Sequence, residues 1–168
     1  MSNAPPDASE PVPACAPHMA SLQRQMRKMS ALPQAPWLHE EVARRLAAKL
    51  TPIRMEPRDW IDWSAFMGAG ADLVQARYPQ AQRWVVEPSQ ALARRSQALL
   101  SMQARRDWRK FWRRDVPQAY VEPTPDDVPW RADGADGAQM LWANMTLHAT
   151  TNLPELMHCW HQHLGDWS

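Results

Sequence analysis

The stretch RDWIDWSAFMGAGADLVQARYPQAQRWVVEPS, residues 58–89, decides the fold of this chain. Its first part predicts a short apolar strand over 60–63, which carries Asp62. A loop with Gly68 and Gly70 follows. An apolar strand that leads into a glycine-containing loop is typical of the first half of a nucleotide-binding βαβ unit.

The second part of the stretch completes the unit. Residues 69–78 read as a helix closed by Pro79, and RWVVE (83–87) is a continuous apolar strand that ends in Glu87. Continuous apolar strands are expected where both faces of a sheet are covered. A glycine loop lets backbone N–H groups approach a ligand, and a carboxylate after the next strand can bind ribose hydroxyls. A dinucleotide and S-adenosylmethionine (SAM) both fit this pattern.

Towards the N-terminus, a helix is predicted over 38–50. Its leucine and valine residues recur every four positions and predict one buried stripe, formed by Leu38, Val42, Leu46 and Leu50. Pro52 ends the helix. Residues 1–34 are a proline-rich stretch followed by a basic segment, and we interpret them as a disordered tail with a mobile lead-in.

Towards the C-terminus, strands and helices continue to alternate. Ser89 is a plausible N-cap for a helix that runs past Leu100. Further strands are predicted at 120–122 and 139–143. Asn152 and Glu155 have capping-box spacing before a last helix. Its predicted buried stripe is Leu153, Leu156, Met157, Trp160 and Leu164. The alternation predicts an α/β fold with a parallel sheet of about four strands, formed by residues 35–168.

Composition limits the classes of function. The chain has 168 residues, of which 45% are hydrophobic and 22% are charged, and its net charge is +1. This balance gives no argument for nucleic acid as a partner. No apolar run reaches membrane-spanning length and no secretory signal is visible, so a cytoplasmic, non-membrane protein is expected. The ten tryptophans are interpreted as core filling.

Three stretches resemble the class I SAM-dependent methyltransferases, and within them the malonyl-ACP O-methyltransferases of biotin synthesis. They are LHEEVARRLAAKL (38–50), WIDWSAFMGAGADLVQARYPQAQRWVVEPSQALARRS (60–96) and QMLWANMTLHATTNLPELMHCWHQHL (139–164). The resemblance implies a Rossmann-like methyltransferase fold, SAM as cofactor, and O-methylation of a malonyl thioester on acyl carrier protein. Family members continue into a fifth strand after the last of these stretches, which implies an incomplete sheet here.

The resemblance also implies roles for individual residues. Asp62, Gly68 and Gly70 would face the methionine part of SAM, and Glu87 would accept hydrogen bonds from both ribose hydroxyls. The adenine would lie near an acid after the third strand. Candidates for that acid are Asp126 and Asp127. The residues near the reacting centre would be Asn144 and His148, which follow the fourth strand.

Departures from the family keep a second interpretation open. The family loop resembles D-x-G-x-G-x-G, but here bulky residues that include Phe66 precede the first glycine. The alternative is a non-catalytic remnant that acts as a binding or scaffold subunit, completed by a second polypeptide at an exposed fourth strand.

Two further patterns are candidates for contacts. The basic segment Arg105–Arg114 suggests docking of the acidic acyl carrier protein, or simply a solvated helix. The last helix carries His158, Cys159, His161 and His163 but lacks the spacing of a four-ligand set, so no metal is expected.

Overall fold

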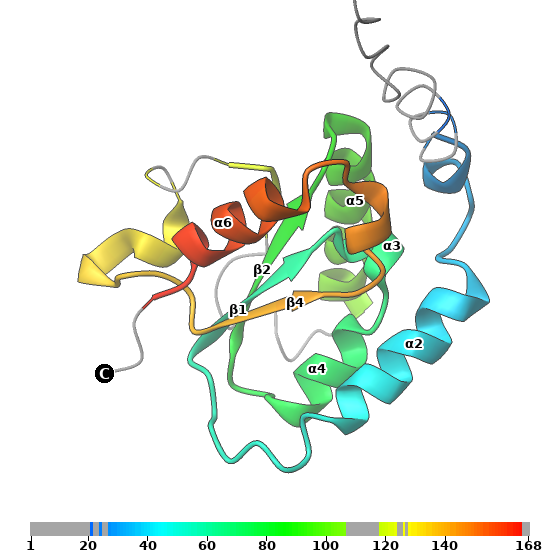
Figure 1. The fold of residues 1–168 in the computed structure, drawn as a ribbon. Helices are drawn as coiled ribbons and strands as arrows, with labels where there is room; N and C mark the ends of the chain where they lie inside the picture. Colours follow the sequence, from blue (N-terminus) through cyan, green and yellow to red (C-terminus); the bar gives the residue numbers. More distant parts are fainter. Residues whose placement is uncertain are drawn as a thin grey trace, which may run out of the picture.

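The computed structural model describes residues 21, 24, 27–106, 118–123, 126 and 128–165. Its centre is an all-parallel sheet with the strand order β3-β2-β1-β4 (Figure 1). The strands are β1 (Asp59–Trp63), β2 (Gln82–Glu87), β3 (Ala119–Val121) and β4 (Met140–Ala143). The fold class, α/β with four parallel strands, is therefore as the sequence predicts, and each strand begins within one residue of its expected position.

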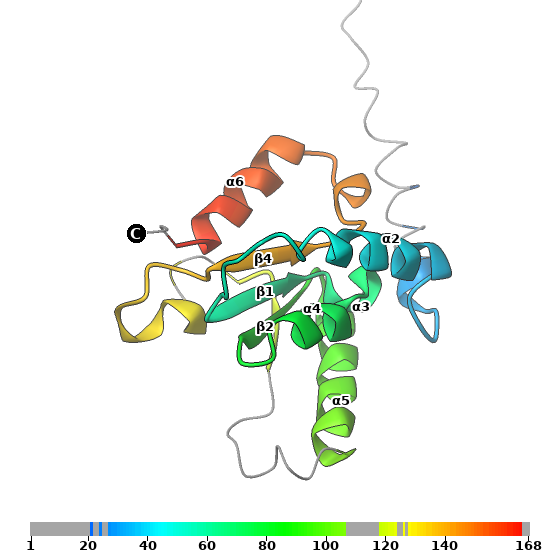
Figure 2. The ribbon, with the colours of Figure 1, turned by 90° about the horizontal axis from the view of Figure 1, so that it is seen from below.

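Helices cover both faces of this sheet. Figure 2 shows α6 on one face and α4 and α5 on the other. The helical elements are α2 (Trp37–Ala48), α3 (Ala65–Gly68), α4 (Ala71–Arg77), α5 (Gln90–Arg106), the 3-10 helices η1 (Pro129–Gly134) and η2 (Leu147–Ala149), and α6 (Leu153–His163). This arrangement is compatible with a Rossmann-like fold.

The strand order places a switch point between β1 and β4. From β1 the chain moves to β2 and then to β3, and it returns past both strands to pair β4 with the other edge of β1. In open α/β sheets, ligands bind outside the carboxyl ends of the strands at such a reversal. The loops after β1, β2 and β4 are therefore the place to look for a site.

On the face that packs against α2 and α4, the core is built around tryptophan and small residues. Trp60 and Trp142 are buried there with Ala43 and Val74. The buried side of α2 differs from the predicted stripe, because His39 and Ala43 face inward, whereas Leu38 and Leu46 are exposed and Val42 is only half-buried. The prediction of that stripe was wrong for these residues. The small Ala43 is what lets α2 approach the sheet closely, and its leucines are left outside. Leu50, the last member of the predicted stripe, is buried.

The opposite face is rich in aromatic rings. Trp63, Trp130 and Trp160 are buried in one cluster with Ile61 and Val86. The rings of Trp63 and Trp160 meet edge to face with centroids 6.1 Å apart. Core filling by tryptophan is confirmed for these three indoles, as it is for the two on the other face.

Two local predictions need correction. The loop after β1 contains one helical turn, α3, because Gly68 N–H reaches back to the Ser64 carbonyl. On α6, Leu153 and Met157 are about half exposed and do not belong to a buried stripe. Trp160 is the buried apolar residue of this helix.

The capping prediction for α6 is confirmed in part. The Asn152 side-chain oxygen accepts a hydrogen bond from the Glu155 N–H, as an N-cap should. The reciprocal bond differs from that of a capping box, because the Glu155 carboxylate accepts from the Asn152 side-chain amide at 2.6 Å.

A short parallel bridge lies just before β4, between Ala138 and Leu164. The Ala138 N–H donates to the His163 carbonyl, and the Gly165 N–H donates back to the Ala138 carbonyl. The strand β4 itself lies at the edge of the sheet in the described part of the chain. No helix within the described ranges is long and apolar enough to cross a membrane. The predicted tail over 1–20 lies outside the described residues.

Candidate functional site

Glu87 ends β2 and is fully buried. Its Oε1 accepts hydrogen bonds from the Phe66 N–H at 2.8 Å and from the Ser96 hydroxyl at 2.5 Å. Burial raises the pKa of Glu87 to about 7, against the opposing effect of these two donors. Its second oxygen, Oε2, has no hydrogen-bond partner among the described residues. Among the described residues, therefore, only one of the two carboxyl oxygens, Oε1, is hydrogen-bonded.

The loop that supplies the Phe66 N–H has an unusual backbone. Ser64 and Ala69 both have φ of 57°, and Ala69 combines this with ψ of −179°. That region is essentially restricted to glycine, so Ala69 stores strain. The Phe66 ring lies under the guanidinium of Arg95, with 4.1 Å from Cζ to the ring centroid. Strained backbone and a buried aromatic ring together hold α3 against Glu87.

The two glycines of the loop serve packing in this structure. Gly70 has φ of 85°, and a Cβ there would lie 2.8 Å from the Cβ of Ala43. Gly70 therefore permits the close approach of α2 to α4. The Gly68 carbonyl accepts a hydrogen bond from the Asn144 side chain. Both predicted cofactor-loop positions lie between β1 and β2 as expected.

Asp62 lies on the same face of the sheet as Glu87. Its Oδ2 accepts two hydrogen bonds from Arg83, at 2.6 Å from Nη2 and 3.0 Å from Nε. Burial raises the pKa of Asp62, and the nearby Arg83 opposes that rise. Asp62 acts on Glu87 as a like charge that adds to the raised pKa of Glu87. The two predicted cofactor acids are thus neighbours in one buried charge cluster with Arg83.

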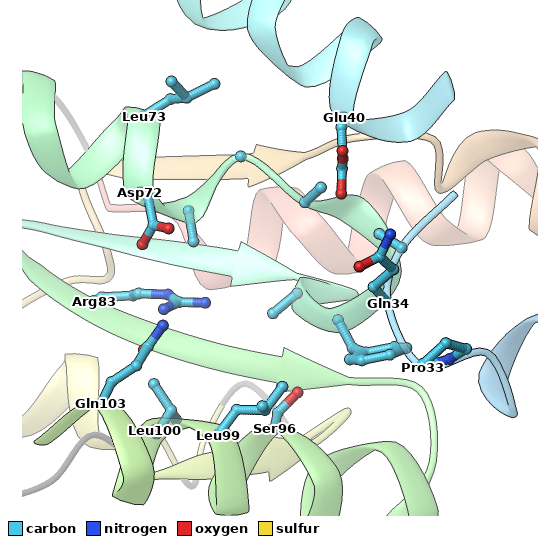
Figure 3. Close-up of a pocket in the computed structure, with 16 residues that line it drawn as sticks. Pro33, Gln34, Glu40, Asp72, Leu73, Arg83, Ser96, Leu99, Leu100 and Gln103 are labelled. Atoms are coloured by element: carbon cyan, nitrogen blue, oxygen red, sulfur yellow. The ribbon is translucent and has the colours of Figure 1, made fainter. Parts of the chain in front are cut away.

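A cavity of about 560 Å³ opens on the same face of the sheet, between α4 and α5. Figure 3 shows Arg83 reaching into it from β2, Glu40 from α2, and Ser96 from α5. Phe66 also lines it. Glu87 is absent from the lining because Phe66 and Ser96, which bind its carboxylate, form the wall at that point.

Asn144, which follows β4, is buried and ties three segments together. Its side-chain amide donates to the His39 carbonyl at 2.8 Å and to the Gly68 carbonyl. His39, in turn, places Nδ1 2.7 Å from the Met67 carbonyl. The amide that the resemblance places near the reacting centre thus joins α2 to the loop after β1.

His148 lies on η2 and is exposed. Its ring and that of His39 are 6.0 Å apart between centroids, with their planes at 81°. Partial burial lowers the pKa of His148, and a positive charge on His39 lowers it further. The two predicted residues of the reacting centre therefore lie on one loop at the carboxyl end of β4.

Of the two predicted adenine acids, only Asp126 lies among the described residues. Asp126 lies in an exposed turn, and Asp127 is outside the described residues. The basic segment Arg105–Arg114 is also outside them apart from its first two residues, which end α5. No group of three or more potential metal ligands is found within the described ranges.

Sequence reasoning missed Arg83, Ser96 and His39. Arg83 has a usable signal, because it stands two and four residues before Val85 and Glu87 and so shares their face of β2. Ser96 and His39 carry no comparable signal, since each sits within an ordinary helical pattern and acquires its partner only through tertiary packing.

Comparisons with protein-family models, curated proteins and solved structures find no match to this chain. The class that the structure itself defines is an α/β domain with a four-stranded parallel sheet and helices on both faces.

Proposed function

We propose that this chain is a SAM-dependent methyltransferase domain in which Glu87 recognises the ribose of the methyl donor. The observation that carries the proposal is the half-satisfied carboxylate at the carboxyl end of β2. A buried carboxylate oxygen without a partner is costly, and paired hydroxyl donors such as those of a ribose would satisfy it.

Two acidic residues favour binding of the methyl donor, SAM, and one aromatic residue obstructs it. The Oε2 atom of Glu87 is free to accept, and Asp62 supplies a second buried acid beside it. Phe66 stands in the way, because it lines the cavity where its N–H also holds Oε1. Binding of an adenosyl group at Glu87 therefore requires that the α3 segment moves.

The methyl acceptor suggested by the resemblance is a malonyl thioester on acyl carrier protein. Its carboxylate is already anionic, so methyl transfer to it depends on orientation and desolvation more than on proton transfer. Carrier docking on Arg105–Arg114 belongs to the same proposal. It predicts that reversing these charges weakens binding of the acidic carrier.

Calorimetric titration with SAM tests the proposal. We expect saturable binding to the unaltered chain and a loss of about tenfold or more in Glu87→Gln, because a hydrogen bond to a charged group contributes roughly 1.5–3 kcal/mol. Affinity should rise as the pH is raised through about 7, where Glu87 becomes a carboxylate. Glu56→Gln, at an exposed position, is the matched control.

A second candidate is favoured by one specific observation. Glu87 is fully buried and already accepts two donors of its own chain, which is how a structural carboxyl group would be held. The chain would then be a non-catalytic binding or scaffold subunit. Its interaction surface would be the outer edge of β4, which is the last strand of the sheet in the described part of the chain.

Absence of SAM binding in a folded sample supports this second candidate over the first. Size-exclusion chromatography with light scattering then gives the next measurement. We expect association through the outer edge of β4. A monomer at all concentrations would contradict the scaffold interpretation.

A further inference from the structure

The strongest feature outside the Glu87 region is the pair of imidazoles at the switch point between β1 and β4. His39 comes from α2 and His148 from η2, far apart in sequence, and their rings meet edge to face 6.0 Å apart. The Asn144 side-chain amide donates a hydrogen bond to the backbone carbonyl of His39 and so fixes that residue's main chain. The pair lies where open α/β sheets bind their ligands.

The tautomer of His39 follows from the hydrogen bond that its ring makes. A carbonyl oxygen can only accept, so the 2.7 Å contact between Nδ1 and the Met67 carbonyl requires a proton on Nδ1. In the neutral ring, Nε2 then carries the lone pair. A fixed tautomer of this kind is how proteins prepare a histidine as a base or a ligand. His39 is only 5% exposed, so its environment is held by the fold.

Strain gathers at the same place. Ala69 has φ of 57° in the loop after β1, and Met145 has φ of 55° in the loop after β4. Both flank Asn144, the residue that joins the two loops. Residues other than glycine in such conformations cluster at functional sites, which supports a role for this corner beyond packing.

We infer that His39 is a general base, with His148 as its route to solvent, and that the methyl acceptor is a protic group such as a hydroxyl. This inference rests on the proposed function and changes its substrate class from a carboxylate to an acceptor that must lose a proton. His148 is exposed, and Leu147 beside it is half exposed, so His148 can be reached from solvent.

The chemical step balances with the donor already proposed. The acceptor oxygen forms a bond to the methyl carbon, and the carbon–sulfur bond of the sulfonium breaks with its electron pair on sulfur. The acceptor proton moves to Nε2 of His39, and the imidazolium releases it to water by way of His148. A neutral pair is needed at the start, and the lowered pKa of His148 is consistent with this.

Two hydrogen bonds hold His39 in place. His39 is held by the Met67 carbonyl from α3, and its own carbonyl is held by the Asn144 amide after β4. Within the described part of the chain, the charged group that acts on His148 is His39. The pH response of His148 should therefore report directly on its partner.

The first test measures the two rings without any turnover. Long-range ¹H–¹⁵N spectra of the full chain should show His39 protonated at Nδ1, and the pKa of His148 should rise in His39→Gln. His158→Gln, at an exposed position on α6, is the control and should leave His148 unchanged. A proton on Nε2 of His39, or an unchanged His148 titration in His39→Gln, would overturn the inference.

The second test uses two thioesters that differ only in the acceptor group, malonyl-CoA and 3-hydroxypropionyl-CoA, with SAM labelled in its methyl group. We expect faster transfer to the hydroxyl, a rate that rises with pH, and a loss of about 100-fold or more in His39→Gln. The exposed His148→Gln variant, which should fold normally, is expected to slow transfer less.

The outcomes separate this inference from the proposed function. If the unaltered chain fails to bind SAM, the proposed function fails. If SAM binds but only malonyl-CoA is methylated, or neither thioester is, or transfer is unaffected by His39→Gln, then His39 is not the base and the inference alone fails.

Discussion

Replacing Glu87 by glutamine should make the protein more stable at alkaline pH. Glutamine keeps an oxygen that can accept from the Phe66 N–H and the Ser96 hydroxyl, but it cannot ionise. Burial raises the pKa of Glu87 from its ordinary value of 4.5 to about 7, so the folded protein holds this proton more tightly than the unfolded chain does.

The sign of the effect follows from linkage. Below about pH 4.5 the Glu87 carboxyl group is protonated in both the folded and the unfolded protein. The stability gained from burying it in the neutral form is then fully present. As the pH rises through about 7, the unfolded chain has already ionised, so folding must either retain a proton or bury a charge. Each unit of difference in pKa corresponds to about 1.4 kcal/mol. The difference between the folded and unfolded pKa of Glu87 therefore corresponds to roughly 3 kcal/mol of stability lost.

Urea unfolding followed by tryptophan fluorescence can measure this loss. The free energies of unfolding of Glu87→Gln and the unaltered chain should differ by roughly 3 kcal/mol more at pH 8.5 than at pH 4.5, in favour of the variant. Comparing the two proteins cancels the titration of the groups that do not interact with Glu87. Glu56→Gln, at an exposed site, corrects for the loss of one negative charge.

One result would refute the reasoning. If the two proteins lose stability in parallel between pH 4.5 and 8.5, then Glu87 ionises equally well in the folded and unfolded states. The carboxylate would have access to water, and neither its burial behind Phe66 nor its hydrogen bonds would be as described.

Three further substitutions test other parts of the site. Asn144→Ala should lower the free energy of unfolding in urea by roughly 2 kcal/mol, because it removes two buried hydrogen bonds that contribute about 1 kcal/mol each, and a loss under 1 kcal/mol would contradict this. Arg83→Met should lower the free energy of unfolding by about 3–5 kcal/mol at pH 7, because Asp62 then has no counter-ion. This loss should shrink as the pH falls and Asp62 becomes protonated. A loss that does not depend on pH would instead indicate lost packing. Ala69→Gly should stabilise by about 1 kcal/mol by relieving a glycine-type backbone, while Ala76→Gly inside α4 should destabilise by a similar amount, and equal effects at the two positions would argue against strain at Ala69.

Short apolar runs bounded by turn residues were sufficient to predict the sheet. Strands β1 and β2 are apolar runs bounded by turn residues, and β4 follows a loop rich in proline, aspartate and glycine, so local pattern and tertiary structure agree there. The buried side of α2 could not be predicted in the same way. Its leucines give the stronger pattern, but the side that packs is chosen by the fit of Ala43 against Gly70 and Trp142.

The site was predictable only as far as single positions carry a signal. Asp62, Glu87 and Asn144 each lie within or just after a strand, and the structure brings them to the same end of the fold. What they bind was beyond the sequence. The bond from Phe66 to Glu87 depends on a helical turn in the loop, which no local pattern indicated.

The central position of β1 has a consequence for how the chain is made. Its partner on one side, β2, emerges from the ribosome soon after it, but its other partner, β4, emerges only after α5, β3 and η1 have been synthesised. During that interval the growing polypeptide presents one open backbone edge of an apolar strand, which invites pairing with a neighbouring nascent molecule. Slow translation between these two segments should therefore lower the yield of native protein.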